Sequence, residues 1–414
     1  SHLATLYFLF LSTGWNFLQT DLQGNRINLI QESDKNWTIK VRNYIQPLRS
    51  INSYGLFRVM TKTRPEIIVE GSTNGEDWKL YDFEWKPSKI LKSEYIDGYD
   101  DNLIESFDNS YNTLIDYTNY QISIPNKDLK LKISGNYSIS IHSENGDFLF
   151  EKKFSVLNKM ISTNIKIKKS SDLEKIDSHQ NIDISVRCDN CNKFNGNSSD
   201  LKLVVIKNNN LNNFRVIEKP DYFLNNTLIY RDISFKGGNE FLNFDSSKIN
   251  STNVKVYKTE LNDFYEIYLR TDIDRTDSFY QYNPDINGSF VINKNFNNPE
   301  IENDYSLVKF SFKPDRIDKK NRVFIIGEFN DYKITNKYEL KLNNNIYKGE
   351  FKFKQGFYNY KYLSLETGGR IKKYSGNFWE TQNIYIALLY HKKLTEKYYK
   401  LISISETSSV NIKN

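Results

Sequence analysis

Short runs in which apolar and polar residues alternate recur along most of the chain. In Tyr137–His142 every second residue is apolar, and the Asn145-Gly146 pair that comes after it predicts a tight turn into a second run at Phe148–Phe150. Further runs typical of half-buried strands lie at 164–168, 182–187, 201–207, 253–257, 264–270, 322–331, 347–353 and 356–362. The pattern predicts many strands joined by turns, with little helix.

Several short strands at regular spacing, with turn residues between them, are typical of β-sandwiches. We therefore expect an all-β fold made of tandem β-sandwich domains. The pattern places a first β domain at 89–158, a second β-sandwich domain at 159–303 and a third domain at 304–392, followed by a C-terminal tail at 393–414. Residues 1–88 differ from the rest of the chain and are expected to form a separate N-terminal segment.

The composition supports a β-rich fold. The 414 residues include 29 Tyr and 27 Phe, whereas alanine occurs only at Ala4 and Ala387. Alanine is the best helix former, while aromatic and β-branched residues suit pleated, half-buried surfaces. The net charge of +6 comes from 57 basic and 51 acidic residues spread along the whole chain. No run of Lys and Arg is therefore dense enough to indicate a nucleic-acid groove.

One apolar stretch lies near the start of the chain, from Leu3 to Leu18. It is shorter than the roughly 18 apolar residues that a membrane-spanning helix needs, and it lacks the basic flank and the small-residue cleavage site of a secretion signal. Three interpretations stay open: a buried element, the end of a truncated membrane span, or the remnant of a signal.

Two turns in the middle of the chain carry the clearest architectural signal. Gly237-Gly238 allows a sharp turn, after which Phe241 and Phe244 return to a core, so we expect Asn239, Glu240 and Asp245 on a fixed rim. A second turn is predicted at 282–290, where Pro284 and the pair Asn287-Gly288 separate two strands. Neither turn carries catalytic chemistry.

Residues that would support catalysis or metal binding are sparse. Cys188 and Cys191 form one CxxC pair, which cannot fill four zinc positions, so we expect a local disulfide or two free thiols. The acidic group Asp97, Asp100 and Asp101 lacks the ligand order of a calcium loop and predicts a capped turn. None of the four histidines lies near a nucleophile motif, and no glycine-rich loop opens a helix. We expect no cofactor, no metal site and no enzyme activity.

Residues 44–88 resemble a fragment of lipase maturation factor, a membrane protein family of secretory compartments. The resemblance rests on the segments Asn52-Ser-Tyr-Gly-Leu-Phe-Arg58, Arg64-Pro-Glu-Ile67, Glu70-Gly-Ser72, Trp78, Phe83 and Lys86-Pro87. It covers about 45 residues, and the remainder of that family's domain has no counterpart in the chain. A chimeric or misassembled sequence, or an N-terminus built from another protein, would explain this.

From about residue 89 to 405 the chain resembles the plug protein family of the Bacteroidetes type IX secretion system. The order and spacing of several segments carry this resemblance: 93–102, 110–113, 116–120, 125–126, 134–137, 237–241 with 244–245, 282 with 285–288, 304–305, 354–360 and 380–383. Plug-family chains usually begin with strands that lead to a Cys-containing, Asp-Trp segment, which is absent here. We infer no function from residues 1–88.

The plug resemblance implies a non-enzymatic protein of the periplasm, associated with the outer membrane but not inserted into it. Its partner would be the giant outer-membrane translocon barrel, whose periplasmic mouth it would close. The candidate contact residues are those on the signature rims: Tyr95, Asp97, Tyr99, Asn239, Glu240, Asp285 and Asn287. These residues could equally serve to hold turns in place.

Two alternatives remain at this point. The order of segments between 322 and 362 resembles the early-set immunoglobulin-like modules beside glycan-active enzymes, so a carbohydrate-binding or glycan-processing accessory protein is possible, with Trp379 and Tyr332 as stacking residues. A lipase-maturation chaperone is the third interpretation. It would make the Asn-x-Ser/Thr triplets at 36–38, 197–199 and 225–227 glycosylation sites, although such triplets are expected by chance in an Asn-rich chain.

Overall fold

The computed structural model describes residues 69–72, 78–81, 91–99, 102–187, 201–393, 396 and 398–412. The chain divides into two units, Ser1–Val69 and Glu70–Asn414, and nearly all described residues belong to the second. Cys188, Cys191, Asp100, Asp101 and most of the N-terminal segment lie outside the described residues.

Strands dominate the described residues, so the predicted all-β class with little helix is confirmed. The described α-helices are single turns, α3 (Lys92–Tyr95) and α4 (Pro299–Glu302). Short 3-10 turns are η5 (Glu328–Asn330), η6 (Asn336–Tyr338) and η7 (Ser409–Asn411). Ahead of the first domain, a two-stranded sheet is formed by β1 (Val69–Ser72) and β2 (Trp78–Tyr81).

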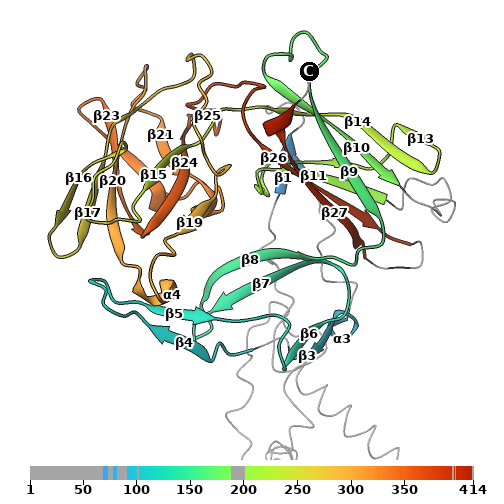
Figure 1. The fold of residues 1–414 in the computed structure, drawn as a ribbon, viewed down its shortest axis with the longest axis horizontal. Helices are drawn as coiled ribbons and strands as arrows, with labels where there is room; N and C mark the ends of the chain where they lie inside the picture. Colours follow the sequence, from blue (N-terminus) through green and yellow to red (C-terminus); the bar gives the residue numbers. More distant parts are fainter. Residues whose placement is uncertain are drawn as a thin grey trace, which may run out of the picture. The chain divides into compact units, whose positions relative to one another are not determined.

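Residues 91–158 form three separate two-stranded sheets, which we call the first domain (Figure 1). The predicted hairpin around Asn145-Gly146 is present, and its strands pair antiparallel from Gly135↔Val156 to His142↔Phe148. The three pairs are β3 (Ile96–Gly98) with β6 (Leu129–Leu131), β4 (Ser106–Asn109) with β5 (Thr118–Gln121), and β7 (Gly135–His142) with β8 (Phe148–Val156). A two-stranded ribbon buries little on its own, and Leu129 is the buried apolar side chain found in the described part of this domain.

Two four-stranded sheets come next, packed face to face as a β-sandwich that we call the second sandwich. One sheet has the order β13-β14-β10-β9 and the other β12-β11-β26-β27. The strands are β9 (Ser162–Lys169), β10 (His179–Arg187), β11 (Leu201–Lys207), β12 (Phe214–Ile217), β13 (Tyr222–Leu224), β14 (Thr227–Lys236), β26 (Ile384–His391) and β27 (Lys400–Ser408). Alternate residues of both sheets, such as Ile182, Leu203 and Tyr385, meet in one core.

Strand pairing divides the chain differently from the predicted domain limits. β26 and β27 lie at the end of the sequence, yet β26 pairs with β11 from Leu201↔His391 to Lys207↔Tyr385 (Figure 1). β27 pairs with β26 in turn, so the segment predicted as a tail, 393–414, contains a strand of the second sandwich. The reason is physical: β11 and β26 are both buried on both faces, so each needs a central position in a sheet, and pairing with one another gives them that position.

The chain between the two parts of the second sandwich forms an 11-stranded sheet system, which we call the aromatic module. Its main path is β15-β24-β21-β22-β23-β20-β17-β16, with β18, β19 and β25 attached at the sides. The predicted limit at 303/304 runs through it, because β15 to β19 precede that position. Its core is rich in aromatic rings, and Phe244 stacks on Tyr358 with ring centroids 5.2 Å apart.

The strands of the aromatic module are β15 (Leu242–Asp245), β16 (Val256–Leu261), β17 (Tyr265–Leu269), β18 (Asp272–Ile273), β19 (Phe290–Ile292), β20 (Tyr305–Lys313), β21 (Arg322–Ile326), β22 (Glu339–Asn343), β23 (Ile346–Lys354), β24 (Gly356–Leu365) and β25 (Ile371–Lys373). Most neighbours run antiparallel, whereas β17 and β18 pair parallel with β20. The long strand β24 carries much of the signature segment 354–360.

Candidate functional site

Three signature segments far apart in the sequence meet where the second sandwich joins the aromatic module. They are 237–241, 285–288 and 380–383, and we call this place, together with Gln180, Lys207 and Lys361, the glycine joint. Gly237 lies so close to residue 378 that an added Cβ would be 1.9 Å from the Phe378 carbonyl oxygen. Gly238 has φ +76°, a conformation that favours glycine. The two glycines therefore permit a backbone approach that other residues would block.

A buried amide network closes one side of the glycine joint. Asn383 donates through Nδ2 to Gln180 Oε1, to the Gly237 carbonyl and to the Thr381 carbonyl, each at 3.0 Å. Tyr385 donates its hydroxyl to the same Gln180 oxygen at 2.7 Å. These side chains are buried, so each hydrogen bond is formed away from competing water. The network fixes the segment before β26 against β10 and the glycine turn.

Glu240, one of the predicted contact residues, is buried in the glycine joint with 1% of its surface exposed. Its Oε1 accepts hydrogen bonds from the Tyr280 hydroxyl at 2.7 Å and from the Gln382 amide at 3.0 Å, and its carbonyl accepts one from Arg275 Nη2 at 2.8 Å. Burial raises the pKa of the Glu240 carboxyl and lowers the pKa of the Arg275 guanidinium. The Glu240 side chain therefore makes its hydrogen bonds within the protein.

Two lysines approach the glycine turn from neighbouring strands. Lys207 at the end of β11 is 5% exposed, and its ammonium donates to the carbonyls of Lys236 and Gly237, both at 2.6 Å. Lys361 in β24 donates to the Asn239 carbonyl at 2.6 Å and lies 3.8 Å from the centroid of the Phe241 ring. Burial is the main reason why the pKa of both lysines is lowered. The pKa of Lys207 lies well below its usual value, and that of Lys361 is about 7.

The predicted turn at 282–290 is held by side-chain acceptors. Asp285 accepts hydrogen bonds from the backbone amides of Phe241 and, at 2.7 Å, of Asn287. Asn359 of β24 accepts from the amides of Ile286 at 2.7 Å and Gly288 at 3.1 Å. Asn287 has φ +56°, which asparagine tolerates better than most residues. Asp285 thus links this turn to the glycine turn.

A second meeting point joins the first domain to the aromatic module, and we call it the Asp304 joint. The Asp304 carboxylate accepts hydrogen bonds from the amides of Leu114 at 2.7 Å and Ile115 at 3.2 Å. Tyr117 donates its hydroxyl to the Asn303 carbonyl at 2.8 Å and has Lys354 Nζ 4.2 Å from its ring centroid. Signature segments 110–113, 116–120, 304–305 and 354–360 all lie at or beside this joint.

The first domain also contacts the second sandwich. Tyr390 of β26 donates its hydroxyl to Asn136 Oδ1 at 2.8 Å. The backbone amides of Asn158 and Met160 donate to the carbonyls of Leu401 and Ile402, at 3.1 Å and 2.9 Å. Asn136 belongs to the signature segment 134–137, so this segment too lies where two parts of the protein meet.

The seven predicted contact residues fall into two groups. Tyr95, Asp97 and Tyr99 belong to the first domain, where Asp97 is exposed and Tyr99 has 75% of its surface exposed. The other four, Asn239, Glu240, Asp285 and Asn287, lie in the glycine joint.

Of the residues expected on a fixed rim, Asn239 and Glu240 are buried, at 3% and 1% exposed, whereas Asp245 is exposed. The turn faces the neighbouring module and not solvent, because its amides and carbonyls need partners there. This arrangement fits the other interpretation of these residues, that they hold turns.

Sequence reasoning missed a set of exposed apolar side chains in the first domain. Phe148, Leu149 and Phe150 are consecutive in β8 and are 62%, 57% and 51% exposed. Three consecutive apolar residues in one strand point to both faces, so one core cannot bury them all. This run was the sequence signal from which the exposed residues could have been predicted. The whole first-domain apolar set is Leu91, Tyr99, Leu103, Phe107, Tyr111, Leu114, Tyr120, Ile122, Phe148, Leu149, Phe150 and Leu157.

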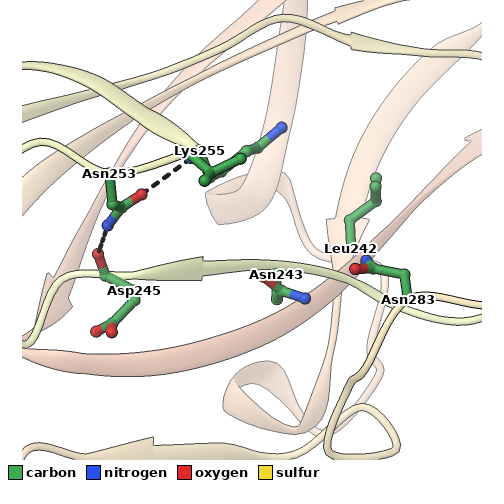
Figure 2. Close-up of a pocket in the computed structure, with 7 residues that line it drawn as sticks. Leu242, Asn243, Asp245, Asn253, Lys255 and Asn283 are labelled. Atoms are coloured by element: carbon green, nitrogen blue, oxygen red, sulfur yellow. Dashed lines mark hydrogen bonds between the residues drawn. The ribbon is translucent and has the colours of Figure 1, made fainter.

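A shallow pocket of about 320 Å³ lies beside β15 in the aromatic module, and Figure 2 shows six of its residues labelled. Asn253 bridges its wall, accepting from the Lys255 amide and donating to the Asp245 carbonyl, both at 2.9 Å. The lining residues are Leu242, Asn243, Asp245, Asn253, Val254, Lys255 and Asn283, with no aromatic ring among them. Among the described residues no group of His, Cys, Asp and Glu is placed to hold a metal ion.

The proposed sugar-stacking residues are engaged elsewhere. The Tyr332 ring packs edge-on against Phe241 with centroids 6.4 Å apart, and Lys169 Nζ lies 4.5 Å from the Trp379 ring centroid. Both side chains are partly buried. In the part of the chain that the structure describes, no helix is both long enough and apolar enough to cross a membrane.

Comparison with known families gives two matches, both in the N-terminal part of the chain. Residues 76–158 match the type 9 secretion system plug protein 1st domain, and residues 50–101 match the lipase maturation factor C-terminal domain. The two matches overlap at 76–101, across the limit that the sequence predicted at 88/89. Both resemblances stated from the sequence are therefore confirmed, the plug resemblance for residues 76–158.

Individual relatives give the same division. Lipase maturation factor 2 of Mus musculus is 44% identical over 50 residues, and that of Xenopus tropicalis 48%; each match covers 12% of this chain. The chain spans only 7% of the length of these curated relatives. The crystal structure of a hypothetical protein from Parabacteroides merdae ATCC 43184 superposes with a TM-score of 0.70 and 27% identity, covering 81% of this chain and 85% of that one.

The plug-domain match suggests a role in type IX secretion. The matched family is a structural secretion component and is not known as an enzyme.

Proposed function

We propose that this chain is a non-enzymatic periplasmic plug that closes the periplasmic mouth of the giant outer-membrane translocon barrel of the type IX secretion system. The observation that carries this proposal is the match of residues 76–158 to the plug protein 1st domain. A very wide barrel left open would let solutes leak, so a stopper seated on its periplasmic side has a clear physical purpose. The plug would associate with the outer membrane through the barrel and would not insert into lipid.

A stopper must keep its shape under load, and the joints between its parts support this role. The Asp304 joint ties the first domain to the aromatic module through two charge-assisted hydrogen bonds from backbone amides. The Tyr390–Asn136 contact ties the same domain to the second sandwich. The glycine joint connects those two larger parts through hydrogen bonds from Lys361 to the Asn239 carbonyl and from Arg275 to the Glu240 carbonyl. Signature residues of the plug resemblance thus serve mainly to hold the parts together.

The contact surface that we propose is the first-domain apolar set, together with the predicted residues Tyr95, Asp97 and Tyr99. Three of these side chains, Phe148, Leu149 and Phe150, are consecutive in β8, and exposed aromatic residues are preferred anchors in binding surfaces. Phe148, Phe150 and Tyr99 have between half and three quarters of their surface exposed. The remaining predicted residues, Asn239, Glu240, Asp285 and Asn287, would act indirectly by fixing the glycine joint.

The experiment is an affinity pull-down of the tagged full chain from the detergent-solubilised outer membrane of a type IX-secreting bacterium. The intact mass of the recovered partner is measured. We expect a very large barrel protein in near-stoichiometric amount. The double variant Phe148→Ser/Phe150→Ser should recover several-fold less, because two apolar anchors are lost.

A matched control is Phe279→Ser in the aromatic module, where the side chain is 97% exposed. It removes a similar apolar area outside the first domain and should leave recovery unchanged. If the natural chain, the double variant and Phe279→Ser all recover the barrel equally well, the contact does not depend on Phe148 and Phe150. Recovery with none, from folded protein, would overturn the plug proposal.

The alternative, a carbohydrate-binding or glycan-processing accessory protein, rests on the early-set resemblance of residues 322–362. The geometry gives it little support, because the Tyr332 and Trp379 rings are packed against Phe241 and Lys169, and the pocket beside β15 has no stacking ring. If the pull-down recovers no barrel, binding of the full chain to a glycan array becomes the next measurement.

A further inference from the structure

A small gap above Gly238 is bordered by two ammonium groups. A methyl group placed on the Gly238 Cα would lie 3.7 Å from Lys207 Nζ and 3.9 Å from Lys361 Nζ, and no other described atom outside the adjoining residues would come within 4 Å. Both ammonium groups therefore border the same space above Gly238, and they carry the same charge.

No carboxylate in the described chain forms an ion pair with either lysine. Glu240 and Asp285 are the nearest acidic groups, and both attract Lys361. Glu240 Oε1, however, accepts hydrogen bonds from the Tyr280 hydroxyl and the Gln382 amide, and the two Asp285 oxygens accept from the amides of Phe241 and Asn287. Arg275 and Lys373 add further positive charge near Lys361.

Each ammonium group has hydrogen-bond capacity left. An ammonium carries three N–H donors, and Lys207 uses two of them on the carbonyls of Lys236 and Gly237. Lys361 uses one on the Asn239 carbonyl. A buried charge without a counter-charge is costly unless it is neutralised or paired. Lys207 thus keeps one donor and Lys361 two, although the Lys361 ammonium also lies 3.8 Å from the Phe241 ring centroid.

We propose that the gap above Gly238 binds one small monovalent anion, of the halide class, between the ammonium groups of Lys207 and Lys361. The anion supplies the missing counter-charge and accepts the spare N–H donors of both lysines. It thereby joins β11 of the second sandwich to β24 of the aromatic module at the glycine joint. This inference is independent of the plug proposal, since the same site would stabilise the joint whatever the partner.

The test uses chloride and bromide as probes on the full chain. The unfolding temperature is measured at about pH 6.5 as chloride replaces gluconate at constant ionic strength, so that general screening does not change. We expect the unfolding temperature to rise with chloride and to saturate. Lys361→Met should abolish the saturable rise, whereas Lys352→Met, which removes an exposed lysine of β23, should keep it.

Crystals grown with bromide provide a readout that does not depend on the stability of any variant. The anomalous difference map should show one peak within hydrogen-bond distance of both Lys207 Nζ and Lys361 Nζ. An unfolding temperature that does not respond to chloride, together with a map without this peak, would overturn the proposal. It would show that the two lysines are accommodated as neutral amines.

Discussion

Single residues decide how closely the parts of this protein approach one another. At Gly237 a side chain has no room, and at Asp304 one carboxylate satisfies amides from another domain. Polar groups buried at such places are costly when they lose a partner, typically by about 1–3 kcal/mol. Substitutions at the joints should therefore lower the free energy of unfolding more than substitutions of the same type on the surface.

Gly237→Ala should be strongly destabilising. The new Cβ would lie 1.9 Å from the Phe378 carbonyl oxygen and 2.7 Å from its carbonyl carbon, so the backbone has to move. We expect a loss of about 2 kcal/mol or more in the free energy of unfolding, measured by denaturant titration. Gly146→Ala is the control, because nothing lies within 4 Å of its Cβ position and only its φ of +85° imposes strain of about 1 kcal/mol. Equal losses in the two variants would contradict the close-approach argument.

Lys361 should make the stability of the protein depend on pH. Its pKa is about 7 in the folded protein and about 10.4 in an unfolded chain, so between these values the unfolded chain binds more protons. The free energy of unfolding should thus rise with pH over this window, by at most about 1.4 kcal/mol per pH unit for this one group.

The slope of the free energy of unfolding against pH is measured by denaturant titration from pH 7 to 9.5 in chloride-free buffer. This range stays below the raised pKa values of the buried tyrosines, such as about 12 for Tyr230. Lys361→Met should reduce the slope, part of which stays because the pKa of Lys207 is lowered too, whereas Lys352→Met should leave it unchanged. An unchanged slope in Lys361→Met would show that the buried ammonium is not the group that titrates.

At the scale of elements, the Asp304 joint should unfold locally while the cores stay folded. Asp304→Ala removes the acceptor for the amides of Leu114 and Ile115 and should cost about 1–3 kcal/mol. Hydrogen exchange at these two amides should become faster, while the amides of β10 and β11 keep their protection. Asp315→Ala, at an exposed carboxylate, should change neither quantity. Unchanged exchange at Leu114 and Ile115 would contradict the proposed role of Asp304.

The strands also show which parts of the fold could be predicted from the sequence alone. Alternation and the Asn145-Gly146 turn predicted the hairpin of β7 and β8, because both strands and their turn are local. The pairing of β11 with β26 could not be predicted, since the two strands are far apart in the sequence and many strands share the same alternation.

The glycine turn shows the same limit at finer detail. Its sharpness was evident from Gly237-Gly238, but the direction in which Asn239 and Glu240 face depends on the neighbouring module. Lys207 and Lys361 gave no signal at all, because a lysine in a strand usually points to solvent.

On the scale of the whole molecule, the N-terminal 88 residues should be dispensable for the folding of the second sandwich and the aromatic module. The cores of the second sandwich and of the aromatic module draw all their buried members from residues 167 onward. A chain that begins at residue 89 should therefore still unfold in a cooperative transition, followed by circular dichroism during heating. Loss of cooperativity would show that the segment belongs to the same fold.

The measurement that tests the central proposal most directly is outer-membrane leakage in a type IX-secreting bacterium that lacks this protein. Uptake of a large, normally excluded dye is compared after complementation with the natural chain, with Phe148→Ser/Phe150→Ser and with Phe279→Ser. If the chain plugs the barrel, its loss raises uptake, the natural chain and Phe279→Ser restore the barrier, and the double variant fails to do so although it is folded and present. Unchanged uptake in the strain without the protein would contradict the plug function.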